Sequence, residues 1–439
     1  MGKYKTYEKY RPSRVEWLGE VPQDWEIRKL KFASPNSSEK LAGKPEGVAY
    51  IGLENIESKT GRLLLESPTE VVDSIVSVFH PGDVLFGKLR PYLAKVFYSD
   101  LFGVCTSELM VLRPISEVID GKYLSYLLLS DGFISLVNST TYGAKMPRAN
   151  SNEILNIQIC RPSLDEQKLI ARFLDRETTR IDTLITKKRQ FIDLLQKKRD
   201  VIIHQAITQG LDSTVPLKES SIPWIGKIPE NWEVRKLKFI ASSLGVGVVI
   251  QPSSYVEEDG GEIPFILGSD ISEGHINVEN ARRISRESNL KLKQTILRAN
   301  DLVCVRVGEP GVTAVVPSEL DGINCASVMI VRQAKSFDSY WLCYVMNSIA
   351  GKANITLVAY GAAQKQFNIS HAVDFLYPFP PSIEDQKRIT AKLDQKLQLI
   401  SKPIQKIKEQ LEELTKYRKS LITAAVTGKI DVREEEFAQ

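Results

Sequence analysis

Several features of membrane, secreted and metal-binding proteins are missing from this sequence. No apolar run in its 439 residues approaches the roughly 20 residues that a membrane helix needs. The first residues lack the apolar core of a signal peptide, so we expect none. The five cysteines are scattered and form no Cys-x-x-Cys pair, and the four histidines show no ligand spacing. We therefore expect a cytoplasmic protein with no membrane partner, no disulfide framework and no metal site.

Sequence motifs for cofactor and nucleotide chemistry are also missing. An adenine methyltransferase needs an Asn/Asp-Pro-Pro-aromatic motif, but the single Pro-Pro pair here lies between Phe379 and Ser382. Gly245 and Gly247 form a G-x-G without the third glycine of a dinucleotide-binding loop. No G-x-x-x-x-G-K-[ST] motif for ATP is present. We expect no catalytic residues and no cofactor-binding residues in this chain.

One short pattern imitates a metal-dependent nuclease. The segments 165–168 (DEQK) and 384–387 (EDQK) resemble the acid-x-Lys end of such a site. A nuclease also needs a separate acidic residue on a neighbouring strand to share the metal. Because both segments follow a serine at a predicted helix start, we interpret their acids as helix-capping residues.

The composition is that of an ordinary soluble globular protein. Hydrophobic residues make up 43% of the chain and charged residues 26%, and the length suggests two to four domains. The net charge of +4 is compatible with nucleic-acid binding, but an ordinary soluble protein explains it equally well.

The chain contains an internal repeat. Residues 17–34 read WLGEVPQDWEIRKLKFAS, and residues 224–242 read WIGKIPENWEVRKLKFIAS. A second pair, 162–212 and 381–431, aligns without a gap. The chain is therefore a tandem duplication with halves of about 1–212 and 213–439. Between these repeats the halves diverge, which suits two parts that dock alike but recognise different things.

The divergent stretches predict mixed α+β domains. Short β-rich runs such as 104–112 and 326–331 are separated by Gly, Pro, Asn and Asp turns. Helical candidates lie near 121–137 and 337–350. The recurring tryptophans are expected to pack in the cores rather than to stack on bases; they are Trp17, Trp25, Trp224 and Trp232.

The second repeat predicts two long helices. Ser163-x-x-Glu166 and Ser382-x-x-Asp385 are typical of capping boxes, and apolar residues then recur at steps of three and four. At roughly 45 residues each helix would be about 65 Å long. A long, narrow apolar stripe favours packing of the two helices against each other, and folding of each helix onto its own domain is the alternative.

The ordered pair of motifs resembles the specificity subunit of type I restriction–modification enzymes. The opening W-[LI]-G-x-[VI]-P-x-x-W, the Tyr-Gly-Ala stretch and the P-S-[LI]-x-x-Q-K helix start each occur twice, so the resemblance covers essentially the whole chain. It implies an α+β fold with two similar mixed α/β target-recognition domains. Each is followed by a long spacer helix, and the two helices pack as an antiparallel coiled coil with pseudo-two-fold symmetry.

This resemblance gives the domain boundaries. It predicts a first target-recognition domain at 1–162 and a central spacer helix at 163–212. A second target-recognition domain follows at 213–380, and a C-terminal spacer helix at 381–439.

The resemblance also implies the partners. The chain would bind double-stranded DNA at an asymmetric bipartite site and scaffold two methyltransferase (modification) subunits, through which restriction/translocase subunits join in host defence of a prokaryote. S-adenosylmethionine, ATP and Mg are expected in those partner subunits, and no cofactor in this chain.

Loops of the divergent stretches supply the candidate DNA contacts. Lys and Arg bind phosphates and guanine, and Asn or Gln can bind adenine with two hydrogen bonds. For each candidate the alternative is an ordinary solvated turn. The DNA-binding candidates are Lys88, Arg90, Tyr92, Tyr142, Lys145, Arg148, Arg306, Tyr360, Gln364, Lys365 and Gln366.

Two other functional classes compete with a DNA-binding scaffold. A fused restriction–methyltransferase enzyme would bind S-adenosylmethionine, but its motifs are missing. A purely structural coiled-coil protein would bind no DNA, so a salt-dependent gel shift on random duplex would exclude it.

Overall fold

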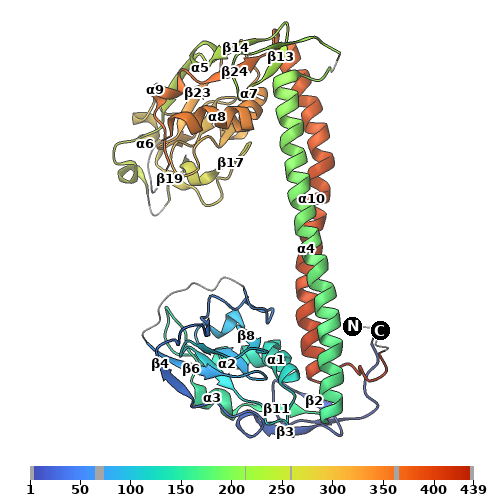
Figure 1. Cartoon of the computed structure of the whole chain (residues 1–439). Helices are drawn as coiled ribbons and strands as arrows, with labels where there is room; N and C mark the ends of the chain where they lie inside the picture. Colours follow the sequence, from blue (N-terminus) through green and yellow to red (C-terminus); the bar gives the residue numbers. More distant parts are fainter. Residues whose placement is uncertain (1–3, 65–73, 213, 258–259, 360–364, 436–439) are drawn as a thin grey trace. The chain divides into compact units, whose positions relative to one another are not determined.

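The computed structural model describes residues 4–64, 74–212, 214–257, 260–359 and 365–435 (Figure 1). The chain divides into two compact units. Unit 1 comprises residues 1–189 and 408–439, and unit 2 comprises residues 190–407. Each unit therefore contains one stretch from either half of the duplicated sequence.

Unit 1 contains short strands around a pair of helices. Its sheets have the orders β1-β2, β10-β7-β8, β11-β3 and β4-β6-β9-β5, and only the β5–β9 pair among the named strands is parallel in the described part of this unit. The elements are β1 (Tyr10–Pro12), β2 (Glu20–Pro22), β3 (Glu26–Lys29), β4 (Lys40–Ala42), β5 (Ala49–Ile51), β6 (Ile75–Phe79), β7 (Val84–Gly87), β8 (Val96–Tyr98), β9 (Gly103–Cys105), β10 (Leu109–Leu112), α1 (Gly121–Leu129), α2 (Asp131–Ser139), α3 (Ser151–Asn156) and β11 (Gln158–Arg161).

Unit 2 repeats several of these pairings. The pair β14–β24 corresponds to β3–β11, the order β23-β20-β21 to β10-β7-β8, and the parallel pair β16–β22 to β5–β9. The elements are β12 (Leu217–Glu219), β13 (Lys227–Pro229), β14 (Glu233–Lys236), α5 (Leu237–Ile240), β15 (Ser243–Val246), β16 (Ile263–Ile266), β17 (Ile271–Ser272), β18 (His275–Ile276), β19 (Arg282–Ile284), α6 (Arg286–Lys291), β20 (Leu302–Cys304), β21 (Thr313–Val315), β22 (Asn324–Cys325), β23 (Met329–Arg332), α7 (Ser339–Asn347), α8 (Ile349–Val358), α9 (Ile369–Ala372) and β24 (Leu376–Phe379).

The predicted helical candidate 121–137 is broken in two by a serine, whereas the candidate 337–350 corresponds to α7 and only the first residues of α8. Ser130 separates α1 from α2, and Ser348 separates α7 from α8. Both serines have extended backbone, and the Ser348 hydroxyl accepts a hydrogen bond from the amide of Gly351. The Ser348 hydroxyl thus caps α8, whereas the Ser130 hydroxyl donates to the Leu127 carbonyl (2.6 Å) at the end of α1.

The two long helices are present at the predicted positions. They are α4 (Leu164–Gln209) and α10 (Ile383–Val426), and each begins in one unit and ends in the other (Figure 1). Pro403 lies inside α10. No helix in the described ranges is both long enough and apolar enough to cross a membrane.

The long helices contribute to the core of each unit. In unit 1, Phe173 and Leu174 of α4 share a buried cluster with Leu421 and Ala425 of α10 and with the helices α1 and α2. In unit 2, Ile203 and Ile207 of α4 share a buried cluster with Leu393 of α10 and with α7. In each unit, residues of both long helices therefore belong to one buried cluster with residues of the α+β domain.

The linear domain boundaries remain a prediction. The compact units group each α+β stretch with one part of both long helices, whereas the prediction counted 163–212 and 381–439 as separate segments.

Candidate nucleic-acid interface

Each unit has a buried aspartate at the start of its central strand. The Asp83 carboxylate accepts hydrogen bonds from the His80 amide (2.9 Å) and from the Arg113 guanidinium (3.0 and 3.1 Å). Asp301 is bonded in the same way by the Arg298 amide (2.9 Å) and by Arg332 (2.5 Å). Both aspartates are 2% exposed. A buried carboxylate with this many donors fixes the start of β7 and of β20, and hence the loops that follow them.

In unit 1 the loop after β7 lies against the Tyr-Gly-Ala stretch. The Ala149 amide donates to the Lys88 carbonyl (3.0 Å), and the Arg90 amide donates to the Pro147 carbonyl (2.7 Å). Tyr142 and Arg148 exchange backbone hydrogen bonds of 3.1 and 3.0 Å, which close a turn that contains Lys145. The structure thus brings together five predicted DNA-binding residues that are distant in the sequence.

The side chains of this cluster are partly exposed and mostly cationic. Tyr142 is 59% exposed, and Lys145 and Arg148 are exposed as well. Arg148 forms an ion pair of 2.5 Å with Glu108. Burial lowers the pKa of Lys88 below its ordinary value, and the nearby Glu108 carboxylate opposes this shift. Such a cluster can donate to DNA phosphates and to acceptors on guanine.

Tyr92 lies elsewhere in unit 1. It lines a cavity of about 450 Å³ together with Arg62, Arg189 and Lys419. These three cations are not among the predicted contacts, because they come from a turn, from α4 and from α10. Only the tertiary structure shows that they share a cavity with a predicted contact.

In unit 2 the corresponding loops also meet. The Gly308 amide donates to the Lys365 carbonyl (3.1 Å), and a backbone bridge joins Val307 to Gln366. The Arg306 guanidinium donates to the Phe367 carbonyl (3.2 Å), which holds it beside this strand end. Tyr360 and Gln364, also predicted as DNA contacts, lie outside the described residues.

The recurring tryptophans pack in the cores, as predicted. Trp25 and Trp232 are 1% and 5% exposed. The Trp17 indole packs against Phe133 and donates to the Gln158 carbonyl (3.1 Å), while Trp224 packs against the core of unit 2.

At the nuclease-like segments the long helices are capped by the preceding serines. The Ser163 hydroxyl accepts from the Glu166 amide (3.3 Å), and the Ser382 hydroxyl accepts from the Asp385 amide (3.1 Å). Glu166 in turn accepts from the Tyr7 hydroxyl (2.7 Å). Among the described residues, no group of three or more His, Cys, Asp or Glu side chains is placed to hold a metal ion.

The chain is similar in sequence to known proteins. Residues 76–193 match the family model of the type I restriction modification DNA specificity domain. The chain is 25% identical to the type I restriction enzyme MjaVIII specificity subunit of Methanocaldococcus jannaschii over 95% of both chains. It is also 25% identical to the type I restriction enzyme EcoBI specificity subunit of Escherichia coli, over 80% of this chain and 74% of that one.

This chain resembles type I restriction enzyme specificity subunits. A solved chain supports its fold. That chain comes from work on complex assembly and conformational transition of a type I R-M system. It has a TM-score of 0.70 and 20% identity, and the match covers 92% of this chain and 98% of that chain. The mixed α/β content and the long helix α4 of this chain are therefore features of a known fold.

Proposed function

We propose that this chain is a specificity subunit that recognises an asymmetric, two-part DNA site and positions methyltransferase subunits on it without catalysing a reaction itself. The observation that carries this proposal is the same loop cluster in two units with different residues. Lys88, Arg90 and Arg148 occupy it in unit 1, and Arg306, Lys365 and Gln366 occupy it in unit 2. Equivalent positions with unequal side chains suit two different half-sites.

The long helices serve as the spacer in this proposal. Because α4 and α10 each belong to both units, one antiparallel coiled coil joins the two recognition domains and sets the gap between the half-sites. Its repeated sequence presents equivalent surfaces to two identical modification subunits. Restriction subunits join through these, and S-adenosylmethionine, ATP and Mg bind in the partners, in the cytoplasm of a prokaryote.

The proposal is tested by mapping N6-methyladenine. The chain is co-expressed with the modification subunit encoded beside it, and methylated adenines are located across the host genome. A split motif with a constant gap that disappears when this chain is omitted supports the proposal. Absence of a motif, or a motif that persists without the chain, contradicts it.

A further inference from the structure

A buried arginine joins the long helices of unit 1 to the recognition domain. Arg418 of α10 is 7% exposed. Its guanidinium donates to both carboxylate oxygens of Asp182 on α4 (3.0 and 3.3 Å). It also donates to the carbonyls of Lys59 (3.0 Å) and Thr60 (3.1 Å). One planar side chain thus connects both helices with the turn 57–62, which a lysine or a neutral residue could not do with the same geometry.

The turn that Arg418 holds is tied to the rest of its domain. The Glu57 amide donates to the Arg62 carbonyl (2.9 Å), which closes the turn, and the Lys59 amide donates to the Ala94 carbonyl (3.1 Å). Ala94 follows Tyr92, a predicted DNA contact, in the segment between β7 and β8. These hydrogen bonds therefore connect the long helices, through the turn 57–62, to the segment that precedes β8.

Unit 2 has an arginine at the same position of the other repeat. Arg199 and Arg418 occupy matching places in the gap-free alignment of 162–212 with 381–431. Arg199 lies 3.5 Å from the Glu273 carboxylate, in the turn between β17 and β18. The Gly274 amide of this turn donates to the Thr313 carbonyl (2.9 Å), as Lys59 does to Ala94 in unit 1. The link from helix to turn is thus present in both units.

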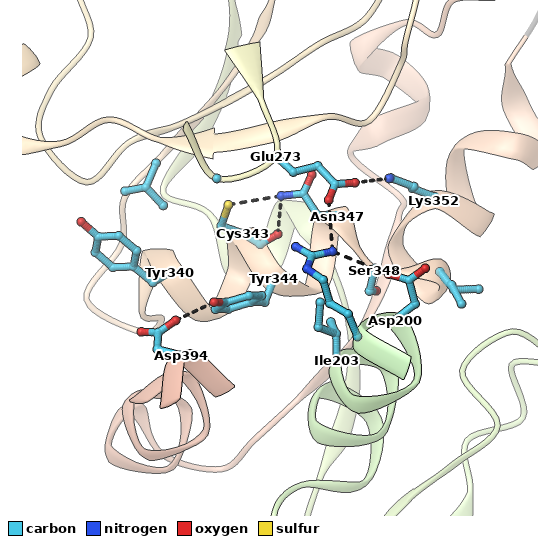
Figure 2. A pocket seen from close by; sticks show the side chains of 14 residues that line it. Asp200, Ile203, Glu273, Tyr340, Cys343, Tyr344, Asn347, Ser348, Lys352 and Asp394 are labelled. Carbon is cyan, nitrogen blue, oxygen red and sulfur yellow. Dashed lines mark hydrogen bonds and ion pairs between the residues drawn. The ribbon is translucent and has the colours of Figure 1, made fainter. Parts of the chain in front are cut away.

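The two links differ in strength. At the position of Asp182 the second repeat has Ser401, so Arg199 has no matching carboxylate on α10. Instead it pairs at 3.6 Å with Asp200, and its side chain is 35% exposed. Glu273 is shared with Lys352, which approaches it to 2.5 Å (Figure 2). Asp182 is likewise shared with Arg62, and both links line cavities of similar volume, about 450 Å³ in unit 1 and about 460 Å³ in unit 2. The Arg418 side chain is only 8% exposed, so water and salt reach the link of unit 2 more easily than that of unit 1.

A second contact beside each arginine is the same in both units. The Tyr126 hydroxyl donates to Asp175 of α4 (2.8 Å), and the Tyr344 hydroxyl donates to Asp394 of α10 (2.5 Å), as Figure 2 shows for the latter pair. Since this contact is common to both units, the difference between them lies in the arginine links.

We propose that Arg418 and Arg199 are positioning residues that fix the orientation of each recognition domain on its long helices, and thereby the gap at which the half-sites are recognised. Arg418 holds the first domain firmly, and Arg199 holds the second through exchangeable ion pairs. This inference rests on the proposed function, because it concerns the gap of a two-part site.

The test measures gap preference separately from half-site recognition. The full chain and its modification subunit methylate a plasmid library in which the two half-sites are separated by the native gap or by gaps one or two base pairs longer or shorter. If the wild-type protein yields no two-part motif, the proposed function fails. If it does, variants of Arg199, Arg418 and Asp182 test whether these links set the gap.

In the Arg199→Ala variant we expect the half-sites to stay unchanged while the preference for the native gap over its neighbours falls by about tenfold, the size of one lost charge-assisted hydrogen bond. Arg199→Lys should restore most of the preference at low salt, because an ammonium can still pair with Glu273. Lys198→Ala, which alters the exposed neighbouring cation, should leave the gap profile as in wild type.

In unit 1, Arg418→Lys should not restore the preference, because an ammonium cannot contact both carbonyls and both carboxylate oxygens at once. Asp182→Asn keeps the shape of the site but removes the charge that pairs with Arg418, so it tests the same link if the Arg418 variants do not fold. An unchanged gap profile in folded Arg199→Ala and Asp182→Asn proteins would overturn the inference. An equal loss of methylation at all gaps would overturn it as well.

Discussion

At the scale of single residues, the cationic side chains at the loop clusters are held in place by neighbouring polar groups. Glu108 pairs with Arg148, and the Phe367 carbonyl accepts from Arg306. A phosphate or guanine that replaces such a partner meets a side chain that is already oriented. The loss of conformational entropy on binding is therefore small.

The residue scale gives a prediction for DNA affinity. Lys145→Ala and Arg148→Ala should each weaken binding to duplex DNA and reduce the slope of log K against log salt by about one, because one phosphate contact is lost. Binding is measured by fluorescence anisotropy during a salt titration. Lys416→Ala, an exposed cation on α10, is the matched control and should leave the slope unchanged. Equal slopes in all three variants would show that Lys145 and Arg148 do not contact DNA phosphates.

A histidine of α4 predicts a pH dependence of stability. Burial lowers the pKa of His204 below its ordinary value of 6.5, and its Nδ1 is buried without a partner in the described structure. Since the unfolded chain takes up this proton at higher pH than the folded protein, stability present above pH 6.5 is lost as the pH falls towards the lowered pKa.

The His204→Gln variant should lose less stability than the wild type over this range. Thermal unfolding is followed from pH 8 to pH 5 in both proteins. Parallel falls in Tm would show that the His204 proton does not contribute.

At the scale of elements, a buried glutamine joins each long helix to the recognition domain. Gln167 accepts from the Asp120 amide (2.7 Å), and Gln386 accepts from the Asp338 amide (2.8 Å). Both glutamines are fully buried. Asp120 and Asp338 cap α1 and α7, so the same residue type ends up at the same contact in both units.

The two glutamines should differ in their contribution to stability. The amide of Gln167 also donates to the carbonyls of Val118 (3.2 Å) and Pro162 (2.9 Å), whereas Nε2 of Gln386 is buried without a partner in the described structure. Gln167→Ala should lower the free energy of opening at the Asp120 amide by about 1–3 kcal/mol, and Gln386→Ala should lower that at the Asp338 amide by less. Hydrogen exchange of the Asp120 and Asp338 amides measures this, and a larger effect in Gln386→Ala would contradict the expected order.

At the scale of the whole molecule, the chain passes from unit 1 to unit 2 and back through the two long helices. Under the proposed function these helices determine the distance between half-sites. Their length should then determine the preferred gap, independently of the side chains that contact DNA.

Inserting four helix-forming residues into α4 at 189–190 lengthens it by roughly 6 Å, which is close to two base-pair steps of about 3.4 Å. The preferred gap should lengthen while both half-sites stay the same, as measured by mapping N6-methyladenine. Replacing residues 187–190 by alanine without a change of length is the control. A constant gap in the lengthened protein would show that the helices are not the spacer.

The repeat, the long helices with their serine caps and the tryptophan cores could all be predicted from the amino-acid sequence. Each of these depends on local patterns: a period of three to four residues, a Ser-x-x-acid start, and large apolar side chains at recurring positions. The sequence also indicated loop residues that the structure brings together, including Lys88 with Arg148 and Arg306 with Gln366.

Which distant groups come into contact depends on how the chain packs in three dimensions. The break at Ser348 and the cavity that joins Tyr92 to Arg62 depend on packing rather than on any local pattern. The role of Arg418 depends on packing as well, because in the sequence it is one of many cationic residues of a long helix. Its role rests on the carbonyls of a turn more than 350 residues away in the chain. Backbone carbonyls are the same for every residue type, so no sequence pattern could have indicated that contact.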